Sequence, residues 1–279
     1  ITPRPQSGNP RPRIFRLVDD RAVINRLGFN NEGHDAAFKR LSQRAGKSGI
    51  VGVNIGANKD AEDRIGDYVA GIRKFYQLAR YFTVNISSPN TPGLRNLQSR
   101  DALRELLSRV LAARDEEGKM CTLKRPVFLK IAPDLSNEEL DDIAAEALEQ
   151  KLDGIIVSNT TLSRNGLNST ENREETGGLS GAPLFERSTI ILARMRERIG
   201  ADVPLIGVGG IDSAETALVK IKAGADLIQL YTGMIYRGPG LASEIVRGLS
   251  DAVKTEGVAS ISDLRDRDTK EWAARRLPD

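Results

Sequence analysis

The sequence predicts an α/β fold built on a parallel sheet or barrel, because short apolar runs alternate with longer amphipathic stretches. Each run is four to seven residues long and rich in Val, Ile and Leu, as strands buried on both faces of a parallel sheet are. No linker or change of composition divides the chain, so we expect one domain over residues 1–279. The runs are Gly49 to Ile55, Tyr81 to Ile86, Pro126 to Ile131, Gly154 to Val157, Leu205 to Val208 and Leu227 to Leu230.

Helix signals lie between these runs. Ser136 to Glu139 has the spacing of a capping box and precedes apolar residues at helical intervals. Asp212 to Glu215 predicts a second capping box, with Gly224 at the C-terminal cap of that helix. Ser99 to Arg114 predicts a third helix. The repeated β-α order indicates a (β/α) barrel.

The strand count bears on whether this barrel closes. A closed barrel of the TIM type has eight parallel strands, whereas we identify about six β-α units here. Ile14 to Leu17 and Ala22 to Asn25 indicate an antiparallel hairpin around Val18 to Arg21 and not barrel strands. We therefore expect a TIM (β/α)8 barrel whose first two strands lie upstream of Ile1, so that the chain is N-terminally incomplete. Alone it would leave long apolar strand edges unpaired, and we expect it to express poorly and not to retain a bound ligand.

The amino-acid composition excludes several classes of function and of site. Lys and Arg number 41 against 38 Asp and Glu, and the basic residues are scattered without interleaved aromatics, which argues against nucleic-acid binding. Cys121 is the only cysteine, so a disulfide framework is excluded and a reducing compartment is favoured. His34 is the only histidine, so a histidine-rich metal site is excluded. At an expected helix start, His34 favours a solvated or capping role over catalysis.

Polar residues recur where the expected strands end. In a barrel of parallel strands these ends share one mouth, which is where such enzymes keep their active sites. Polar residues also mark strand ends in general, but that does not explain why amides, a lysine and a diglycine recur at the same end. The residues are Asn54, Asn85, Lys130, Ser158 to Thr160, Gly209 and Gly210, and Tyr231 and Thr232.

Two glycine clusters indicate phosphate binding. Gly177 to Gly181 precedes the fifth run, and Gly207 to Ile211 lies at the end of it. Glycine lets the backbone approach a ligand closely, and barrels often hold phosphate in the loops after their last two strands. A lone cluster indicates a turn more often than a site, but two clusters together with Tyr231 to Gly233 favour a phosphate site.

The segment from Asn85 to Arg95 resembles the active-site loop of dihydroorotate dehydrogenases. Further motifs stand around it in that family's order and spacing, and the resemblance covers essentially the whole chain. It implies the membrane-associated, quinone-reducing class, whose members oxidise dihydroorotate to orotate with bound FMN in de novo pyrimidine (UMP) biosynthesis. The further motifs are Asn25 to Asn31, Gly52 to Gly56, Lys130 to Asp134, Ser158 to Thr161 and Gly177 to Gly181.

The resemblance implies a role for each matching residue, and it implies no metal ligand. Ser88 matches the catalytic base, and the serine indicates the membrane-associated class because the soluble class has cysteine there. Ser158 stands where threonine is common and keeps the hydroxyl. The substrate-binding positions are Asn25, Arg26, Leu27, Gly28, Phe29, Asn85, Asn90, Asn159 and Thr160. The FMN contacts are Asn54, Asn85, Lys130, Ser158, Gly181, Gly210, Tyr231 and Thr232.

The same resemblance implies a quinone as the final electron acceptor and peripheral membrane association through a segment upstream of Ile1. We expect the cytoplasmic side of a bacterial inner membrane, although a mitochondrial inner membrane also fits. A phosphosugar isomerase or synthase barrel would share the phosphate glycines, but it would be expected to place acidic residues at the strand ends. A dihydropyrimidine oxidoreductase would be the nearest flavoenzyme to this pattern, and a barrel fragment that binds nothing would also share the β-α repeat.

Overall fold

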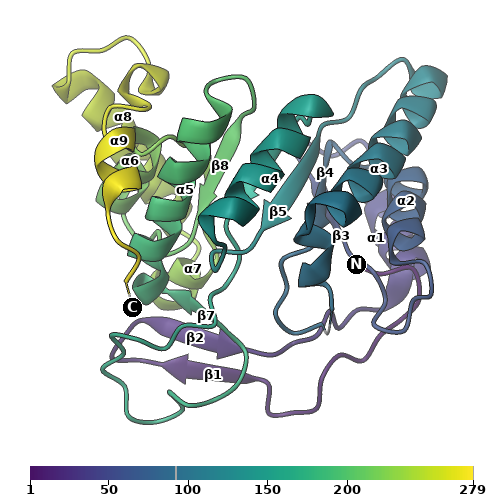
Figure 1. Cartoon of the computed structure of the whole chain (residues 1–279), viewed down its shortest axis with the longest axis horizontal. Coiled ribbons are helices and arrows are strands. Elements are labelled where there is room, and N and C mark those ends of the chain that lie inside the picture. The colour runs from purple at the N-terminus through teal and green to yellow at the C-terminus, as the bar shows by residue number, and fades with distance from the viewer. Residues whose placement is uncertain (92, 279) are drawn as a thin grey trace.

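The structure is a computed structural model that describes residues 1–91 and 93–278 (Figure 1). In these residues, a parallel sheet of six strands forms the centre, in the order β3-β4-β5-β6-β8-β9. This confirms the six β-α units that the apolar runs predict. The strands are β3 (Gly52–Ile55), β4 (Tyr81–Asn85), β5 (Val127–Ile131), β6 (Gly154–Val157), β8 (Leu205–Val208) and β9 (Leu227–Gln229). The expectation that further barrel strands lie upstream of Ile1 stays a prediction.

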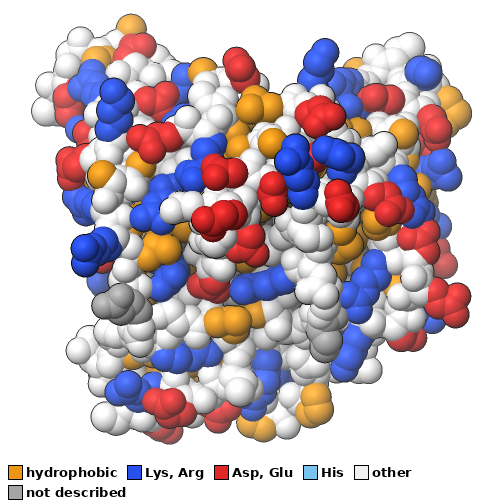
Figure 2. All heavy atoms as spheres, viewed as in Figure 1, with side chains coloured by type: hydrophobic (Ala, Val, Ile, Leu, Met, Phe, Trp, Pro, Cys, Tyr) orange, Lys and Arg blue, Asp and Glu red, His pale blue; other side chains and the backbone are white. Residues whose placement is uncertain are grey.

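Helices connect the strands and cover the sheet. Figure 1 shows α3, α4 and α5 side by side over one face of it. Ion pairs link these helices: Glu146, which is fully buried, accepts hydrogen bonds from Arg100 and Arg104 of α3. Figure 2 shows acidic and basic side chains interspersed over this face. The helices are α1 (Gly33–Gln43), α2 (Arg64–Phe75), α3 (Arg100–Cys121), α4 (Asn137–Glu149), α5 (Phe185–Ile199), α6 (Ala214–Lys222), α7 (Thr232–Arg237), α8 (Leu241–Thr255) and α9 (Thr269–Ala274), with short 3-10 turns at Arg95–Gln98, Ala182–Leu184 and Ile261–Leu264.

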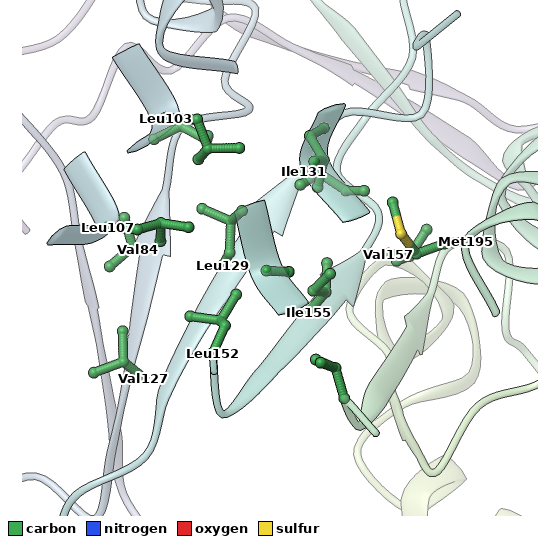
Figure 3. Packing of buried hydrophobic residues seen from close by; sticks show 14 of the residues in the cluster. Val84, Leu103, Leu107, Val127, Leu129, Ile131, Leu152, Ile155, Val157 and Met195 are labelled. Atoms are coloured by element: carbon green, nitrogen blue, oxygen red, sulfur yellow. The ribbon is translucent and has the colours of Figure 1, made fainter. Parts of the chain in front are cut away.

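The main hydrophobic core lies between the sheet and its helices. Val84 of β4 and Leu129 of β5 are fully buried, and Leu103 and Leu107 of α3 pack in the same cluster (Figure 3). Burying an aliphatic side chain of this size stabilises a fold by roughly 1.5–3 kcal/mol. This packing fixes the strand register, in which Asn85 lies beside Lys130 at the carboxyl ends of β4 and β5.

A second, antiparallel sheet lies across the carboxyl ends of the main strands (Figure 1). The predicted hairpin is confirmed as β1 (Ile14–Leu17) and β2 (Ala22–Asn25). Its third strand, β7 (Gly178–Gly181), pairs with β2 and comes from the glycine cluster that indicated a phosphate loop. The cluster is therefore a strand, and Gly181 at its end lines a cavity described below. Its part in phosphate binding stays a prediction. A Cβ at Gly181 would stand 2.4 Å from the carbonyl O of Arg21, so the glycine permits close strand pairing.

Two helix boundaries differ from the sequence predictions. The capping box at Ser136 and Glu139 is confirmed, but the second box joins Ser213 to Thr216, one residue beyond the predicted Asp212 and Glu215. Gly224 follows that helix with a φ of 123°, as its capping position requires. The third predicted helix begins as expected after Ser99 but continues to Cys121.

His34 is neither solvated nor a capping side chain, contrary to the sequence interpretation. It is 6% exposed, and its ring lies edge-on to Phe75 with centroids 5.2 Å apart. Glu32 is the N-cap residue and makes no capping hydrogen bond with its side chain, while Asn31 Oδ1 accepts a hydrogen bond from the backbone N–H of Gly33 at 2.9 Å. His34 is buried because the first turn of α1 packs against α2. This burial lowers the pKa of His34 to about 4.

Candidate active site

The carboxyl ends of the parallel strands open into a cavity of about 480 Å³. Asn54, Asn85, Lys130 and Ser158 line it from β3 to the loop after β6. The second sheet closes the opposite side through Val23 and other residues. This volume lies within the range of roughly 300–1,000 Å³ that is common for small-molecule sites.

A second cavity of about 350 Å³ adjoins the first. The loop after β4 lines it with Ser88 and Asn90, and the segment after β2 lines it with Gly28 and Phe29. The two cavities therefore meet at a shared set of polar walls, so two ligands bound there would lie against each other. The shared residues are Asn25, Leu27, Asn54, Asn85, Asn159 and Thr160.

The structure brings nearly all the sequence-predicted site residues together. The larger cavity is lined by all of the expected cofactor contacts: Asn54, Asn85, Lys130, Ser158, Gly181, Gly210, Tyr231 and Thr232. The smaller cavity is lined by Ser88 and by the expected substrate contacts Asn25, Leu27, Gly28, Phe29, Asn85, Asn90, Asn159 and Thr160.

Arg26 is the exception among the expected substrate contacts. It lines neither cavity. Its NH1 group pairs with Glu175 at 2.6 Å, and its guanidinium lies 4.5 Å from the ring centroid of Phe15. The Arg26 side chain therefore holds the segment before β7 against the hairpin.

Ser88 lies on a loop whose own polar groups fix its shape. Ser88 is 6% exposed, and its Oγ accepts a hydrogen bond from the backbone N–H of Asn90 at 3.2 Å. The Asn90 side chain in turn donates to the carbonyl O of Asn25 at 3.1 Å, which joins the loop to the end of β2. Pro92 belongs to the same sequence motif and lies outside the described residues.

A chain of amide and hydroxyl groups crosses the floor between the cavities. Asn159 Nδ2 donates to Ser87 Oγ at 2.8 Å, and Ser87 Oγ donates to Asn85 Oδ1 at 2.9 Å. The Tyr68 hydroxyl donates to the carbonyl O of Asn85 at 2.8 Å. These bonds restrict how the two amides can rotate, and Asn85 and Asn159 both line the two cavities.

Arg95 clamps three parts of the site together. Its Nε donates to the carbonyl O of Ser87 at 3.1 Å, and its NH2 group donates to the carbonyl O of Thr160 at 3.2 Å. Its NH1 group pairs with Asp134 at 3.3 Å. Asp134 also accepts hydrogen bonds from Thr161 Oγ1 and the backbone N–H of Leu162. This network sets the position of the Ser88 loop relative to the loop after β6.

Lys130 is the single charged residue in the described lining of the larger cavity. It comes from a β5 strand of otherwise apolar residues, and its ammonium makes no hydrogen bond or ion pair with any residue that the structure describes. Burial lowers the pKa of Lys130 below its ordinary value. An ammonium so placed is suited to meet an anionic ligand.

The main chain of the loop after β8 also lines the larger cavity. Gly209 and Gly210 follow β8 with φ values of 120° and 72°, which favour glycine. A Cβ at Gly210 would stand 2.4 Å from the Cβ of Phe185, so no side chain fits there. Beside this loop, Thr232 Oγ1 donates to Ser180 Oγ at 2.9 Å.

Sequence reasoning assigned no role to several residues of this site. Arg95 stands in the quoted loop motif, but its contacts join segments up to 65 positions apart, and no local pattern signals them. The apolar wall of the larger cavity includes Ile14, Val23 and Leu230. No local pattern signals this wall, because it forms where the hairpin and the strand ends of the main sheet meet.

Two adjoining cavities at the carboxyl ends of parallel strands are typical of an α/β enzyme with its active site at that end. The comparisons with known proteins make this class specific. A family model described as dihydroorotate dehydrogenase matches residues 1–253. The chain belongs to the dihydroorotate dehydrogenase family, whose members use a flavin.

Curated relatives are very similar to the chain. It is 87% identical over 277 residues to the dihydroorotate dehydrogenase (quinone) of Brucella anthropi, which covers 99% of this chain and 76% of that protein. Identity to the protein of the same name from Brucella ovis is 86% over the same length. These identities confirm the resemblance to quinone-type dihydroorotate dehydrogenases that the sequence motifs indicated.

Solved structures agree with the fold. DHODH from Eimeria tenella in complex with ferulenol is 40% identical, with a TM-score of 0.91 over 96% of this chain and 77% of that one. The ligand-free form gives a TM-score of 0.89 at the same identity, covering 96% of this chain and 80% of that one. In the described part of the chain, no helix has both the length and the hydropathy needed to cross a bilayer.

Proposed function

We propose that this chain oxidises dihydroorotate to orotate with FMN as the hydride acceptor and a quinone as the final electron acceptor, in pyrimidine biosynthesis. The observation that carries the proposal is the pair of adjoining cavities. One cavity gathers every expected cofactor residue, and the other gathers Ser88 with the amides expected to hold substrate. The curated relatives, which are named for this reaction, support the same conclusion.

The larger cavity fits FMN by its chemistry. Lys130 offers a cation without a partner among the described residues, suited to the negative charge of a reduced flavin. Gly209 and Gly210 offer main chain to a phosphate at the other end. When bound, FMN would accept the hydride from substrate C6 and later pass two electrons to the quinone. The apolar residues between these ends would cover the ring system.

In the smaller cavity, the side chains of Asn25, Asn90 and Asn159 would hold the carboxylate and amide edges of dihydroorotate, since each amide offers a donor and an acceptor. Ser88 Oγ would take the proton from C5 as the C5–H bond breaks, while the hydride leaves C6. A serine hydroxyl is a weak base at neutral pH, so its own proton has to move on. A water chain near Thr91, which is buried on the same loop, would carry that proton away.

The proposal also covers the final electron acceptor and the location of the enzyme at a membrane. The relatives' names include the quinone, and enzymes that reduce membrane quinones work at a membrane surface. We propose peripheral association with the cytoplasmic side of a bacterial inner membrane. The apolar cavity wall formed by Ile14, Val23 and Leu230 would face the electron acceptor.

Anaerobic spectroscopy tests the proposal. Purified at full length, the enzyme should be yellow, release FMN on denaturation, and lose its visible flavin absorbance when dihydroorotate is added without oxygen. Orotate should form in equal amount to the flavin bleached, and a quinone should restore the colour. A colourless protein that converts a sugar phosphate would instead support a phosphosugar isomerase. A yellow protein that dihydroorotate fails to bleach would contradict the proposed substrate.

A further inference from the structure

Lys220 is a buried cation that no role proposed above uses. It lies on the inner face of α6 with an exposed fraction of 0%. Its Nζ donates to Ser188 Oγ at 2.6 Å and to the carbonyl O of Phe185 at 3.4 Å, and the Phe185 ring centroid lies 5.0 Å away. No carboxylate in the described residues pairs with it. Burial lowers the pKa of Lys220 well below its ordinary value, and an anion bound nearby would favour its charged form. A fully buried lysine without a counter-ion destabilises a fold, so this one indicates a function beyond packing.

Ser188 joins this ammonium to the glycine loop, residues 207–210. Its Oγ accepts a hydrogen bond from Lys220, and its own hydrogen has two acceptors within reach: the carbonyl O of Phe185 at 3.1 Å and the carbonyl O of Gly209 at 3.2 Å. A Cβ at Gly209 would stand 2.7 Å from this Oγ, so the loop backbone rests directly on the serine. One hydroxyl group therefore separates the Lys220 ammonium from the loop that lines the larger cavity.

Lys130, the single charged residue in the described lining of the cavity, does not come from a strand next to the glycine loop. Lys130 projects from β5, and β6 separates that strand from β8, which carries the loop. Arg21 lies on the far side of Gly210, but it is engaged by Asp212 at 2.9 Å. A charge buried in the interior is screened far less than a surface charge and acts over a longer distance. Lys220 is thus the cation placed to offset negative charge at the loop.

We propose that Lys220 is a positioning residue for the cofactor phosphate: acting through Ser188, it fixes the glycine loop and offsets the negative charge of a phosphate bound there. The inference rests on the proposed function, because it assigns the phosphate of FMN to the glycine loop. It predicts that Lys220 contributes to the affinity for the phosphorylated flavin and not to the affinity for the ring system.

Flavin affinity of Lys220→Met tests this, because methionine keeps the length and loses the charge. After reversible removal of bound flavin, FMN and riboflavin are titrated against the enzyme by fluorescence quenching. Lys220→Met should weaken FMN binding about tenfold or more and change riboflavin binding less than about twofold. Lys222→Met on the same helix is the matched control, since Lys222 pairs with Glu256 near the surface, and it should change neither affinity.

Equal weakening of both flavins would mean a merely structural role, and no weakening of either would mean no role at the loop; either result overturns the inference. If Lys220→Met does not fold, Ser188→Ala keeps the ammonium and breaks its link to Gly209. That variant should lower the preference for FMN over riboflavin in the same direction, and an unchanged preference would overturn the inference. An enzyme that prefers FMN through Lys220 but is not reduced by dihydroorotate would contradict only the proposed substrate.

Discussion

The Arg95 clamp gives the sharpest prediction about how the site is held. Arg95→Met removes two hydrogen bonds to carbonyl groups and the ion pair with Asp134, at 3.1–3.3 Å. Hydrogen bonds to charged groups contribute about 1.5–3 kcal/mol each. Because the Arg95 and Asp134 side chains are 23% and 20% exposed, we take the lower end. Two hydrogen bonds at about 1.5 kcal/mol each, with the partly solvated ion pair counted as negligible, should lower the free energy of unfolding by about 3 kcal/mol.

The larger effect should be on catalysis, because Arg95 holds the Ser87 carbonyl next to Ser88. Misplacing a catalytic group by about 1 Å can slow a reaction about 10²-fold. Single-turnover flavin reduction by dihydroorotate, followed by rapid mixing, should therefore slow about 10²-fold in Arg95→Met while FMN stays bound. Arg73→Met is the control, because Arg73 forms an exposed ion pair with Glu116 and should alter neither rate nor stability measurably. Wild-type reduction by Arg95→Met would refute the clamp.

Two further predictions concern Lys130 and His34. Lys130→Ala should lower the flavin reduction potential and weaken FMN retention, and an unchanged potential in spectroelectrochemistry would show that the lysine does not face the flavin. The pKa of His34 is about 4 in the fold against an ordinary value of 6.5, so the unfolded chain binds a proton more readily. The contribution of His34 to the free energy of unfolding is therefore fully present above about pH 6.5 and is lost as the pH falls toward about 4. Between about pH 7 and 5 the free energy of unfolding should fall by about 2 kcal/mol from this group. Denaturant unfolding of His34→Phe should lack this part of the acid dependence, and an identical pH profile would rule it out.

The parallel sheet was predictable because its strands are buried on both faces and so form continuous apolar runs. Strand β7 was not, because a run of Gly-Leu-Ser-Gly has low β-propensity. It forms because glycine lets it approach β2: a Cβ at Gly177 would stand 2.4 Å from the carbonyl O of Asn25. Tertiary pairing therefore decided the structure of a segment whose local sequence indicated a loop.

The strand-end residues of the site were predictable for a geometric reason. Carboxyl ends of parallel strands converge, so Asn54, Asn85 and Lys130 had to meet once the strands were identified. The orientation of Arg26 was not predictable, because its partner Glu175 lies 149 positions away. Lys220 carried a usable signal, since it occupies an inward position of α6 between Ala217 and Ile221, where a charged residue is unusual.

The most direct measurement of the central claim is stopped-flow reduction of the Ser88→Ala enzyme by dihydroorotate without oxygen. We predict that FMN remains bound and that flavin bleaching slows by about 10²–10⁴-fold, because a positioned base contributes about that factor. Ser88→Cys should retain part of the rate, since its thiol can also accept a proton. Bleaching of Ser88→Ala at the wild-type rate would contradict the role of Ser88 and, with it, the assignment of the smaller cavity as the place where dihydroorotate reacts.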